Sequence, residues 1–231
     1  MERTKRVLGA ELMLKMLAGY SLAVMCLFAA VLRPAWKNYY IAVKTVCSFS
    51  FLAVLTAAAV CGEQEAQFMR MLPAFLCCLA GDVFLAFYNR FRRRPQFLAG
   101  LFCFLAGHIG FVRWLCAGRP LRAGDMLFPA AAVLLALGLT GGTYLHTGRL
   151  RPYIALYTFF VALFCAKGVS LPAAEPGTAS LFTAAGAALF FLSDFSILFL
   201  YFGRRKGPWL HVFNLATYYY GMFFLAVSLL F

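Results

Sequence analysis

Eight apolar segments, each long enough to cross a lipid bilayer, fill almost all of the 231-residue chain. A bilayer-crossing helix needs about 20 mostly apolar residues, because the hydrocarbon core leaves backbone groups no partners except one another. The segments are predicted over residues 11–32, 39–61, 71–88, 96–116, 126–146, 152–171, 178–202 and 209–231. The gaps between them are short and carry Pro, Gly and charge. The sequence therefore predicts an all-α, polytopic membrane bundle of about eight transmembrane helices in a single domain.

The composition excludes several other classes of protein. Hydrophobic residues make up 64% of the chain and charged residues 13%, with a mean hydropathy of +0.82, which is far outside the range of a soluble domain. The 21 Lys and Arg residues stand in short clusters between apolar segments, so the net charge of +13 indicates membrane topology rather than nucleic-acid binding. The eight cysteines lie mostly inside apolar segments, and we interpret them as packing residues rather than a disulfide framework or a zinc site.

The basic N-terminus followed by an apolar run superficially matches a signal peptide. The run from Leu17 to Leu32 is too long for the apolar core of such a peptide, and Arg33-Pro34-Ala35-Trp36 makes a poor cleavage site. We interpret this region as the first transmembrane span.

Basic residues in the gaps predict the orientation of the chain. Loops one, three, five and seven carry the larger share of them, so the positive-inside rule places these loops in the cytoplasm and both termini outside. The basic N-terminus argues for the opposite orientation. The cytoplasmic assignment rests on Arg33, Lys37, Arg90, Arg92, Arg93, Arg94, Arg149, Arg151, Arg204, Arg205 and Lys206.

The two halves of the chain resemble each other weakly around Asp82 and Asp194. Each aspartate follows an apolar stretch and a small residue, and three basic residues follow it ten to twelve positions later. This pattern suggests a duplicated four-helix unit, with halves at about 1–116 and 126–231. Chance alignment of apolar sequence is the alternative.

Asp82 and Asp194 stand apart from the other acidic residues, which fall at termini, span ends or loops. An aspartate at mid-helix costs about 2.5–3.5 kcal/mol on insertion scales, and such residues usually face the bundle interior or a water-filled cavity. The two lie at similar depths, about 12 Å and about 15 Å from the basic loops that follow. We expect them to share one cavity as catalytic groups. The alternative is that each simply hydrogen-bonds a neighbouring helix.

Three further polar residues lie in neighbouring spans on the same side of the membrane. We expect His108 to orient an aspartate or relay a proton; the alternative is that it only packs between helices. Lys44 is suited to steering a phosphate or pairing with a carboxylate, and the alternative is snorkelling to the headgroups. Tyr157 lies about five residues into its span, from the same side as Lys44.

The last span carries His211, Asn214 and Tyr218 at positions i, i+3 and i+7, which places them on one face. A polar stripe on a membrane helix normally faces inward, so we expect Asn214 and Tyr218 to support the site. Tyr219 is interpreted as a packing or interfacial residue. Lys167, near the opposite end of its helix, is interpreted as a snorkelling anchor.

Several catalytic motifs are missing from the sequence. There is no Gly-rich phosphate loop, no G-x-S-x-G nucleophile elbow and no dense metal-ligand cluster. The three histidines are scattered. We expect activity that needs neither a metal nor another cofactor.

The order of these features resembles the YhhN-like integral membrane proteins, the lysoplasmalogenase family. The resemblance covers nearly the whole chain from Tyr39 onward. The matching pieces are Lys44, Leu79 to Leu85 around Asp82, the Gly100, Phe104 and His108 pattern, Tyr157, Phe191 to Asp194, and Tyr218-Tyr219.

The resemblance implies hydrolysis of the vinyl ether bond of a lysoplasmalogen to a fatty aldehyde and a glycerophospho-ethanolamine or -choline. Such a bond cleaves by protonation of its β-carbon, so the site needs a carboxylic acid, which burial favours, and a carboxylate to stabilise the cation. The apolar neighbours Leu192 and Phe195 favour Asp194 as the acid, but the sequence does not decide which aspartate is the acid and which the base.

Two other functional classes stay open at this stage. Paired intramembrane aspartates are also typical of small proton-coupled transporters, and a lipid-binding scaffold would need neither aspartate for chemistry. The expected partners are a lysophospholipid substrate and membrane lipids, without nucleic acid; the oligomeric state is left open. Short loops and the lack of an evident organelle-retention signal favour a bacterial inner membrane, and the endoplasmic reticulum is the alternative.

Overall fold

Long helices joined by short connections make up the computed structural model of the protein, which describes residues 2–142, 145, 147–203 and 207–231, with side chains from residue 9 on. Each helix is long and apolar enough to cross a membrane, which confirms the predicted all-α polytopic bundle. The α-helices in these ranges are α1 (Glu2–Leu32), α2 (Tyr40–Cys61), α3 (Glu65–Phe91), α4 (Arg94–Gly118), α5 (Leu127–Gly141), α6 (Arg151–Ala174), α7 (Thr178–Phe202) and α8 (Pro208–Val227).

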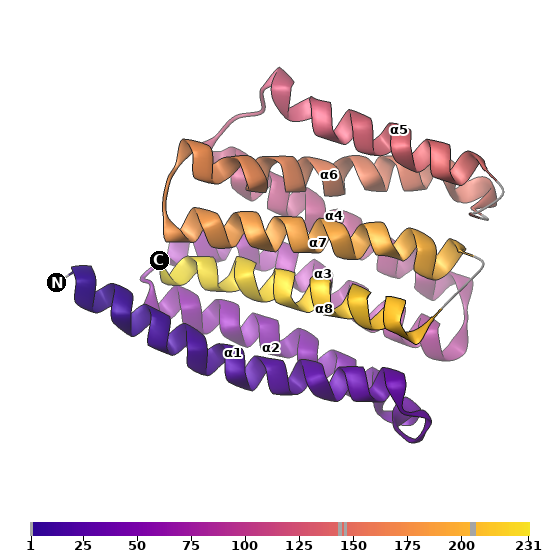
Figure 1. Ribbon diagram of the computed structural model, residues 1–231, viewed down its shortest axis with the longest axis horizontal. Helices are drawn as coiled ribbons and strands as arrows, with labels where there is room; N and C mark the ends of the chain where they lie inside the picture. The colour runs from indigo at the N-terminus through magenta and orange to yellow at the C-terminus, as the bar shows by residue number, and fades with distance from the viewer. Residues whose placement is uncertain (1, 143–144, 146, 204–206) are drawn as a thin grey trace.

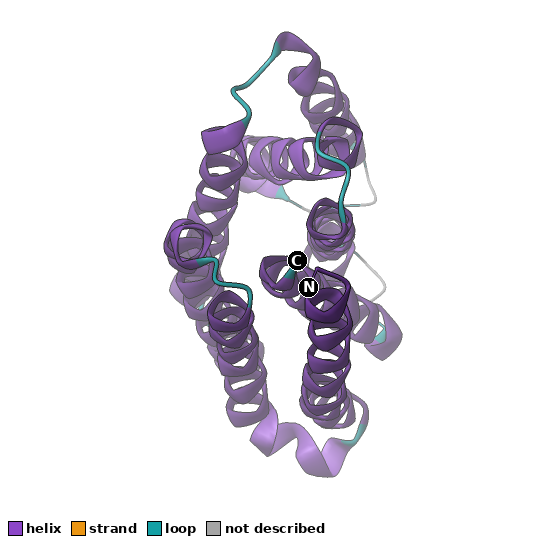
Figure 2. Cartoon of the chain, turned by 90° about the vertical axis from the view of Figure 1, so that its left-hand side faces the viewer, coloured by secondary structure: helices purple, strands orange, loops and turns teal. Residues whose placement is uncertain are grey.

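The helices lie side by side, and both chain termini are found at the same end of the bundle (Figure 1). The last helix, α8, is the central one. In its most apolar segment 72% of the residues are buried, against 22% in α1 and 17% in α5, which lie at the edges. Figure 2 views the bundle from the end that holds the termini and shows the C-terminus between surrounding helices.

Some helix limits differ from the predicted ones. The predicted span 126–146 is too long at its end, because α5 stops at Gly141, where two adjacent glycines interrupt the helix. A short 3₁₀ turn, Ala123–Met126, lengthens it at the start. Pro172 lies inside α6 rather than in the gap predicted after residue 171, and Pro73 lies inside α3, within the predicted span 71–88. Prolines are tolerated there because neighbouring groups in a membrane bundle can bond the freed backbone carbonyls.

Two pairs of helices approach closely through glycine. A Cβ atom on Gly81 of α3 would lie 2.8 Å from the Phe104 ring of α4. A Cβ atom on Gly186 of α7 would lie 2.9 Å from the backbone oxygen of Gly221 in α8. Small residues at such contacts let membrane helices gain van der Waals packing. Both aspartate-bearing helices, α3 and α7, are therefore held tightly against their successors.

A row of buried aromatic rings crosses the bundle. Phe51 of α2 packs edge-on against Phe75 of α3, Phe75 against Phe111 of α4, and Phe111 stacks on Phe164 of α6, with ring centroids 5.0–5.6 Å apart. Each ring lies one or two turns from a polar candidate residue, on the side toward the termini. The row therefore places apolar packing between these polar residues and the end of the bundle that holds the termini.

Candidate active site

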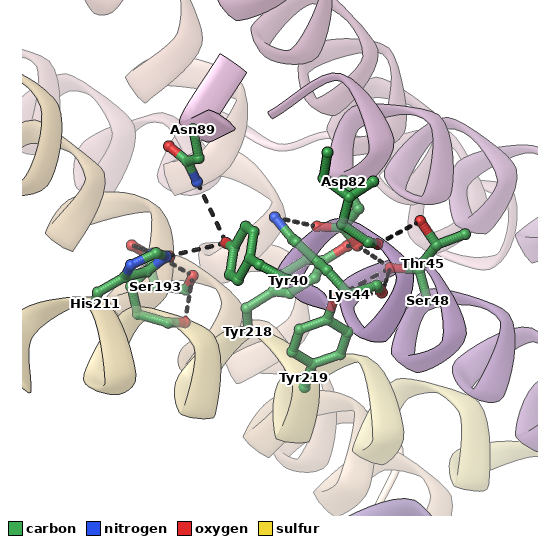
Figure 3. Close-up of polar contacts among 12 residues, drawn as sticks. Tyr40, Lys44, Thr45, Ser48, Asp82, Asn89, Ser193, His211, Tyr218 and Tyr219 are labelled. Atoms are coloured by element: carbon green, nitrogen blue, oxygen red, sulfur yellow. Dashed lines mark hydrogen bonds and ion pairs between the residues drawn. The ribbon is translucent and has the colours of Figure 1, made fainter. Parts of the chain in front are cut away.

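The buried carboxyl group of Asp82 is held by groups from two helices (Figure 3). The ammonium nitrogen of Lys44 in α2 lies 3.0 Å from Oδ1. Ser48, one turn further along α2, donates a hydrogen bond of 2.7 Å to Oδ2, and Tyr218 of α8 donates one of 2.8 Å to the same oxygen. Asp82 is only 1% exposed and Lys44 is 5% exposed. Lys44 therefore pairs with a carboxylate and does not snorkel to the membrane surface.

Ser48 and Tyr219 belong to this site, although the sequence analysis did not select them. The Tyr219 hydroxyl lies 3.1 Å from Ser48 Oγ and donates to the Lys44 backbone oxygen at 3.2 Å. Tyr219 is fully buried, so the interfacial interpretation was wrong, while the packing one holds. The spacing of Ser48, four residues after Lys44, places both on one face and was a usable signal.

Asp194 has a different set of partners, drawn from α4 and α6. His108 Nε2 lies 2.6 Å from Asp194 Oδ2, and the Tyr157 hydroxyl donates to the same oxygen at 3.0 Å. Asp194 is 6% exposed and His108 is fully buried. Within the described part of the chain, His108 Nδ1 has no hydrogen-bond partner. The imidazole therefore has one polar contact, and that contact is the aspartate.

Aromatic rings connect the surroundings of the two aspartates. The Tyr218 ring, whose hydroxyl bonds Asp82, lies 5.2 Å from the Phe190 ring. Phe190 in turn lies 4.6 Å from the His108 imidazole, which bonds Asp194. The single side chain of Phe190 thus lies between Tyr218, a partner of Asp82, and His108, a partner of Asp194. A single shared cavity stays a prediction.

The polar stripe on α8 faces inward, but its residues contact different helices. Asn214 contacts α7 rather than a carboxylate: its amide donates to the Ser193 backbone oxygen and to Ser193 Oγ, each at 2.9 Å, and to Ser196 Oγ at 3.1 Å. Ser193 immediately precedes Asp194. Asn214 is therefore bonded to the turn of α7 that carries the aspartate, and its role in supporting the site stays a prediction.

His211 belongs to a second polar chain, nearer the end of the bundle opposite the termini (Figure 3). Its Nε2 lies 3.2 Å from the Tyr40 hydroxyl, which accepts a hydrogen bond of 3.3 Å from the Asn89 amide. Tyr201 donates to Asn89 Oδ1 at 3.2 Å. Tyr40 stands one helical turn before Lys44, so this chain lies directly outside the Asp82 site. The sequence analysis missed Tyr40, Asn89 and Tyr201 because single polar residues near span ends carry little signal.

The interpretation of Lys167 as a snorkelling anchor was wrong. Its side chain is 2% exposed, lies 3.1 Å from Asp125 Oδ2 and donates to the backbone oxygens of Arg119 and Pro120. The buried ammonium ties α6 to the connection between α4 and α5. It contacts neither intramembrane aspartate.

Some predicted features lie outside the described residues: His146 and the basic run Arg204, Arg205 and Lys206. Among the described residues, no group of three or more His, Cys, Asp and Glu side chains is arranged to hold a metal ion. The independence of activity from metals stays a prediction.

Comparison with known proteins assigns the chain to a family. No curated protein and no solved structure matches the chain. A sequence profile of the YhhN family matches residues 41–229, which include both aspartates and all their named partners. The chain therefore belongs to the YhhN family.

Proposed function

We propose that this protein is a membrane hydrolase that cleaves the vinyl ether bond of a lysoplasmalogen. The products are a fatty aldehyde and a glycerophospho-ethanolamine or -choline. Membership of the YhhN family, which suggests lysoplasmalogenase activity, supports the reaction. One structural observation supports the chemistry: two buried aspartates have unlike partners, a lysine at Asp82 and a histidine with a tyrosine at Asp194.

In the proposed reaction Asp194 is the general acid. It donates a proton to the β-carbon of the vinyl ether, and the remaining electron pair on oxygen gives an oxocarbenium ion. His108, 2.6 Å from the carboxyl group, positions it and supplies a route for the proton that must return. The His108 imidazole is fully buried and lies 4.6 Å from the Phe190 ring, and these apolar surroundings limit competing proton exchange with water.

Asp82 takes the role of the carboxylate. The Lys44 ammonium at 3.0 Å favours its ionised form, and the Ser48 and Tyr218 hydroxyls orient it. An ionised group beside the oxocarbenium ion stabilises that cation and accepts a proton from the attacking water. As the resulting hemiacetal collapses to the aldehyde, Asp82 passes this proton to the leaving glycerol oxygen, and the hemiacetal hydroxyl returns its proton to Asp194 through His108. Both carboxyl groups thereby regain their starting protonation states.

The proposed location is a bacterial inner membrane. The structure describes a multi-pass bundle whose spans are joined by short connections. The proposed substrate is an amphipathic lipid of the same membrane, and its vinyl ether lies close to the headgroup.

The test uses purified protein in neutral detergent, a lysoplasmalogen and its saturated alkyl ether analogue, with mass spectrometry of the products. Aldehyde release from the first lipid and an intact second lipid are expected, because only the vinyl ether can be protonated at carbon. Dialysis against a chelator should leave the rate unchanged. Fatty acid release from an ester lysolipid at an equal rate would contradict the scheme.

The transporter alternative has its own outcome in the same experiment. If neither ether lipid is cleaved, while Asp82→Asn abolishes uptake of a solute into vesicles, the aspartates serve transport and the hydrolase assignment is wrong.

A further inference from the structure

A pocket of about 510 Å³ opens at the end of the bundle opposite the termini, where α3 and α7 end and α2 and α8 begin. Three basic residues, Lys37, Arg90 and Arg92, contribute to its wall, and none of the described residues that line it is acidic. We propose that this pocket binds the phosphodiester of a lysophospholipid headgroup and so positions the lipid for Asp82. The identity of the lipid rests on the function proposed above.

The charge of this pocket distinguishes it from those at the other end of the bundle. The pocket there of about 860 Å³ is lined by Glu11 and Glu63 as well as Lys15. A phosphodiester carries one negative charge and acceptor oxygens, which arginine binds through paired charge-assisted hydrogen bonds. Of these two pockets, the one with Arg90 and Arg92 has the chemistry to select an anion.

Arg92 is held at the pocket by an unusual backbone. It ends α3 in the left-handed conformation, with φ 56° and ψ 29°, and its N–H donates to the Tyr88 oxygen at 2.8 Å. Glycine is the usual residue at such a position because a Cβ atom is disfavoured there. The arginine side chain lies over the Tyr88 ring, with its guanidinium carbon 5.7 Å from the ring centre. An arginine is thus present where the backbone alone favours glycine.

The distance from this pocket to Asp82 fits the length of the lipid. Asn89 lines the pocket and stands seven residues after Asp82 on α3, an axial rise of about 10 Å. In a lysoplasmalogen, seven bonds separate the phosphorus from the β-carbon of the vinyl ether, about 8 Å for an extended chain. The Arg92 side chain reaches back over the Tyr88 ring, to about the level of Asn89. A phosphate bound at that level brings the reactive carbon to within about 2 Å of the depth of Asp82.

Polar side chains line the path between the two points. Tyr40 joins His211 and Asn89 by hydrogen bonds in the pocket, and Lys44 lies one helical turn deeper, paired with Asp82 (Figure 3). These groups offer donors and acceptors to the glycerol of the substrate and to the water that the reaction consumes. In this arrangement the apolar alkyl chain of the lipid contacts apolar side chains of the helices and not the polar path.

The experiment measures binding without chemistry. Purified protein in neutral detergent is titrated with a saturated alkyl ether lysophospholipid and, separately, with the 1-alkylglycerol of equal chain length, which lacks the phosphate. We expect the phospholipid to bind at least about tenfold more tightly, because the alkylglycerol forgoes the charge-assisted hydrogen bonds. Equal affinities for the two lipids would overturn the proposal.

Two glycine variants separate the side chain from the backbone. Arg92→Gly removes the guanidinium and relieves the left-handed backbone, so the fold should be retained while phospholipid affinity falls by about tenfold. Glu63→Gly makes the same backbone change at φ 56° at the other end of the bundle and should leave the affinity unchanged. If both variants bound the phospholipid as tightly as the wild-type protein does, Arg92 would not be a phosphate-binding residue.

Inorganic phosphate identifies the source of the anion. The lipid assignment expects free phosphate to bind weakly and to be displaced by the ether lysophospholipid. If phosphate binds and the lipid does not compete, the pocket serves a free anion and the lipid assignment is wrong.

Failure of this proposal differs from failure of the hydrolase assignment. Aldehyde release with an unchanged KM in Arg92→Gly and Arg90→Gln would keep the hydrolase and reject the pocket. Arg92-dependent binding without any aldehyde release would keep the pocket and reject the hydrolase.

Discussion

The two intramembrane aspartates occupy comparable places in the fold but have unlike neighbours. Asp82 and Asp194 both lie on helices that pack closely against their successors, and each accepts a tyrosine hydrogen bond, from Tyr218 and Tyr157 respectively. Asp82 adds a lysine ammonium at 3.0 Å. Asp194 has instead the imidazole of His108 at 2.6 Å. A lysine offers a lasting positive charge, whereas a histidine exchanges protons readily.

The difference indicates why two carboxyl groups are present. A site with two equivalent aspartates would bind a proton between them, without a defined donor. In the proposed mechanism the lysine neutralises the charge of Asp82, and the histidine returns a proton to Asp194. Unequal surroundings of this kind are how paired carboxyl groups divide acid and base roles. The comparison between Asp82 and Asp194 is therefore the part of the proposed mechanism most open to test.

Each of the two aspartates takes partners from both halves of the chain, and the pattern is the same for both. Each aspartate has one partner from the helix before it, Lys44 or Tyr157, at 38 and 37 residues' distance. Each has a second partner from the last helix of the other half: α8 for Asp82 and α4 for Asp194. The helix pairs α2 with α8 and α4 with α6 pack together accordingly.

We propose that the fold arose by duplication of a four-helix unit. The test is a superposition of residues 40–118 on residues 151–227. Agreement of α2, α3 and α4 with α6, α7 and α8 in that order supports the duplication, and a better fit with another order rejects it.

The largest expected effect is on catalysis at Asp194. Asp194→Asn keeps the size of the side chain but removes the transferable proton, so kcat should fall by about 10²–10⁴-fold. Aldehyde release under single turnover measures it. Binding of the saturated ether lysolipid to the variant is the control and should be retained. A rate within threefold of the unchanged protein would end the assignment of Asp194 as acid.

Loss of the lysine should destabilise the fold. Lys44→Met leaves the Asp82 carboxylate buried without its counter-ion, which typically costs about 3–5 kcal/mol of unfolding free energy. The double variant Lys44→Met with Asp82→Asn removes both charges and should recover most of that stability without recovering activity. Denaturation in detergent gives both values. A double variant as unstable as the single one would show that the ion pair is not the cause.

The two tyrosines should differ in importance. Tyr157→Phe leaves Asp194 with His108 alone, whereas Tyr218→Phe leaves Asp82 with Lys44 and Ser48. Asp194 becomes a carboxylate as it gives up its proton, and a hydrogen bond to a charged group contributes about 1.5–3 kcal/mol, so kcat should fall by about 10–100-fold for Tyr157→Phe. Tyr218→Phe should lose less than that. Equal losses in both variants would mean that the sites are more alike than their partners indicate.

The smallest effect on catalysis is expected from the third pair, which Lys167 forms with Asp125. Lys167→Met removes the contacts to Asp125, Arg119 and Pro120, far from both aspartates, and should lower the unfolding free energy by about 1–2 kcal/mol. The kcat for aldehyde release should stay unchanged. Any large loss of kcat at full folding would show that this pair communicates with the active site.

The sequence by itself determined the class of fold and the identity of the central residues. Apolar length sets the number of spans, because a bilayer leaves backbone groups no other partners. The cost of burying an ionisable group picked out Asp82 and Asp194, and the helical period placed Tyr218 on an inward face. These features depend on local composition and spacing, which a single chain displays directly.

The tertiary structure decided which groups meet. That Lys44 pairs with Asp82 and His108 with Asp194, that Asn214 binds α7, and that Lys167 is buried depend on which helices are neighbours and how each is rotated. Contacts within the site join residues up to 175 positions apart, as between Tyr219 and Lys44, and no local pattern encodes them. In a membrane bundle every span is apolar, so hydrophobicity alone does not specify the packing partners; small residues and polar contacts do.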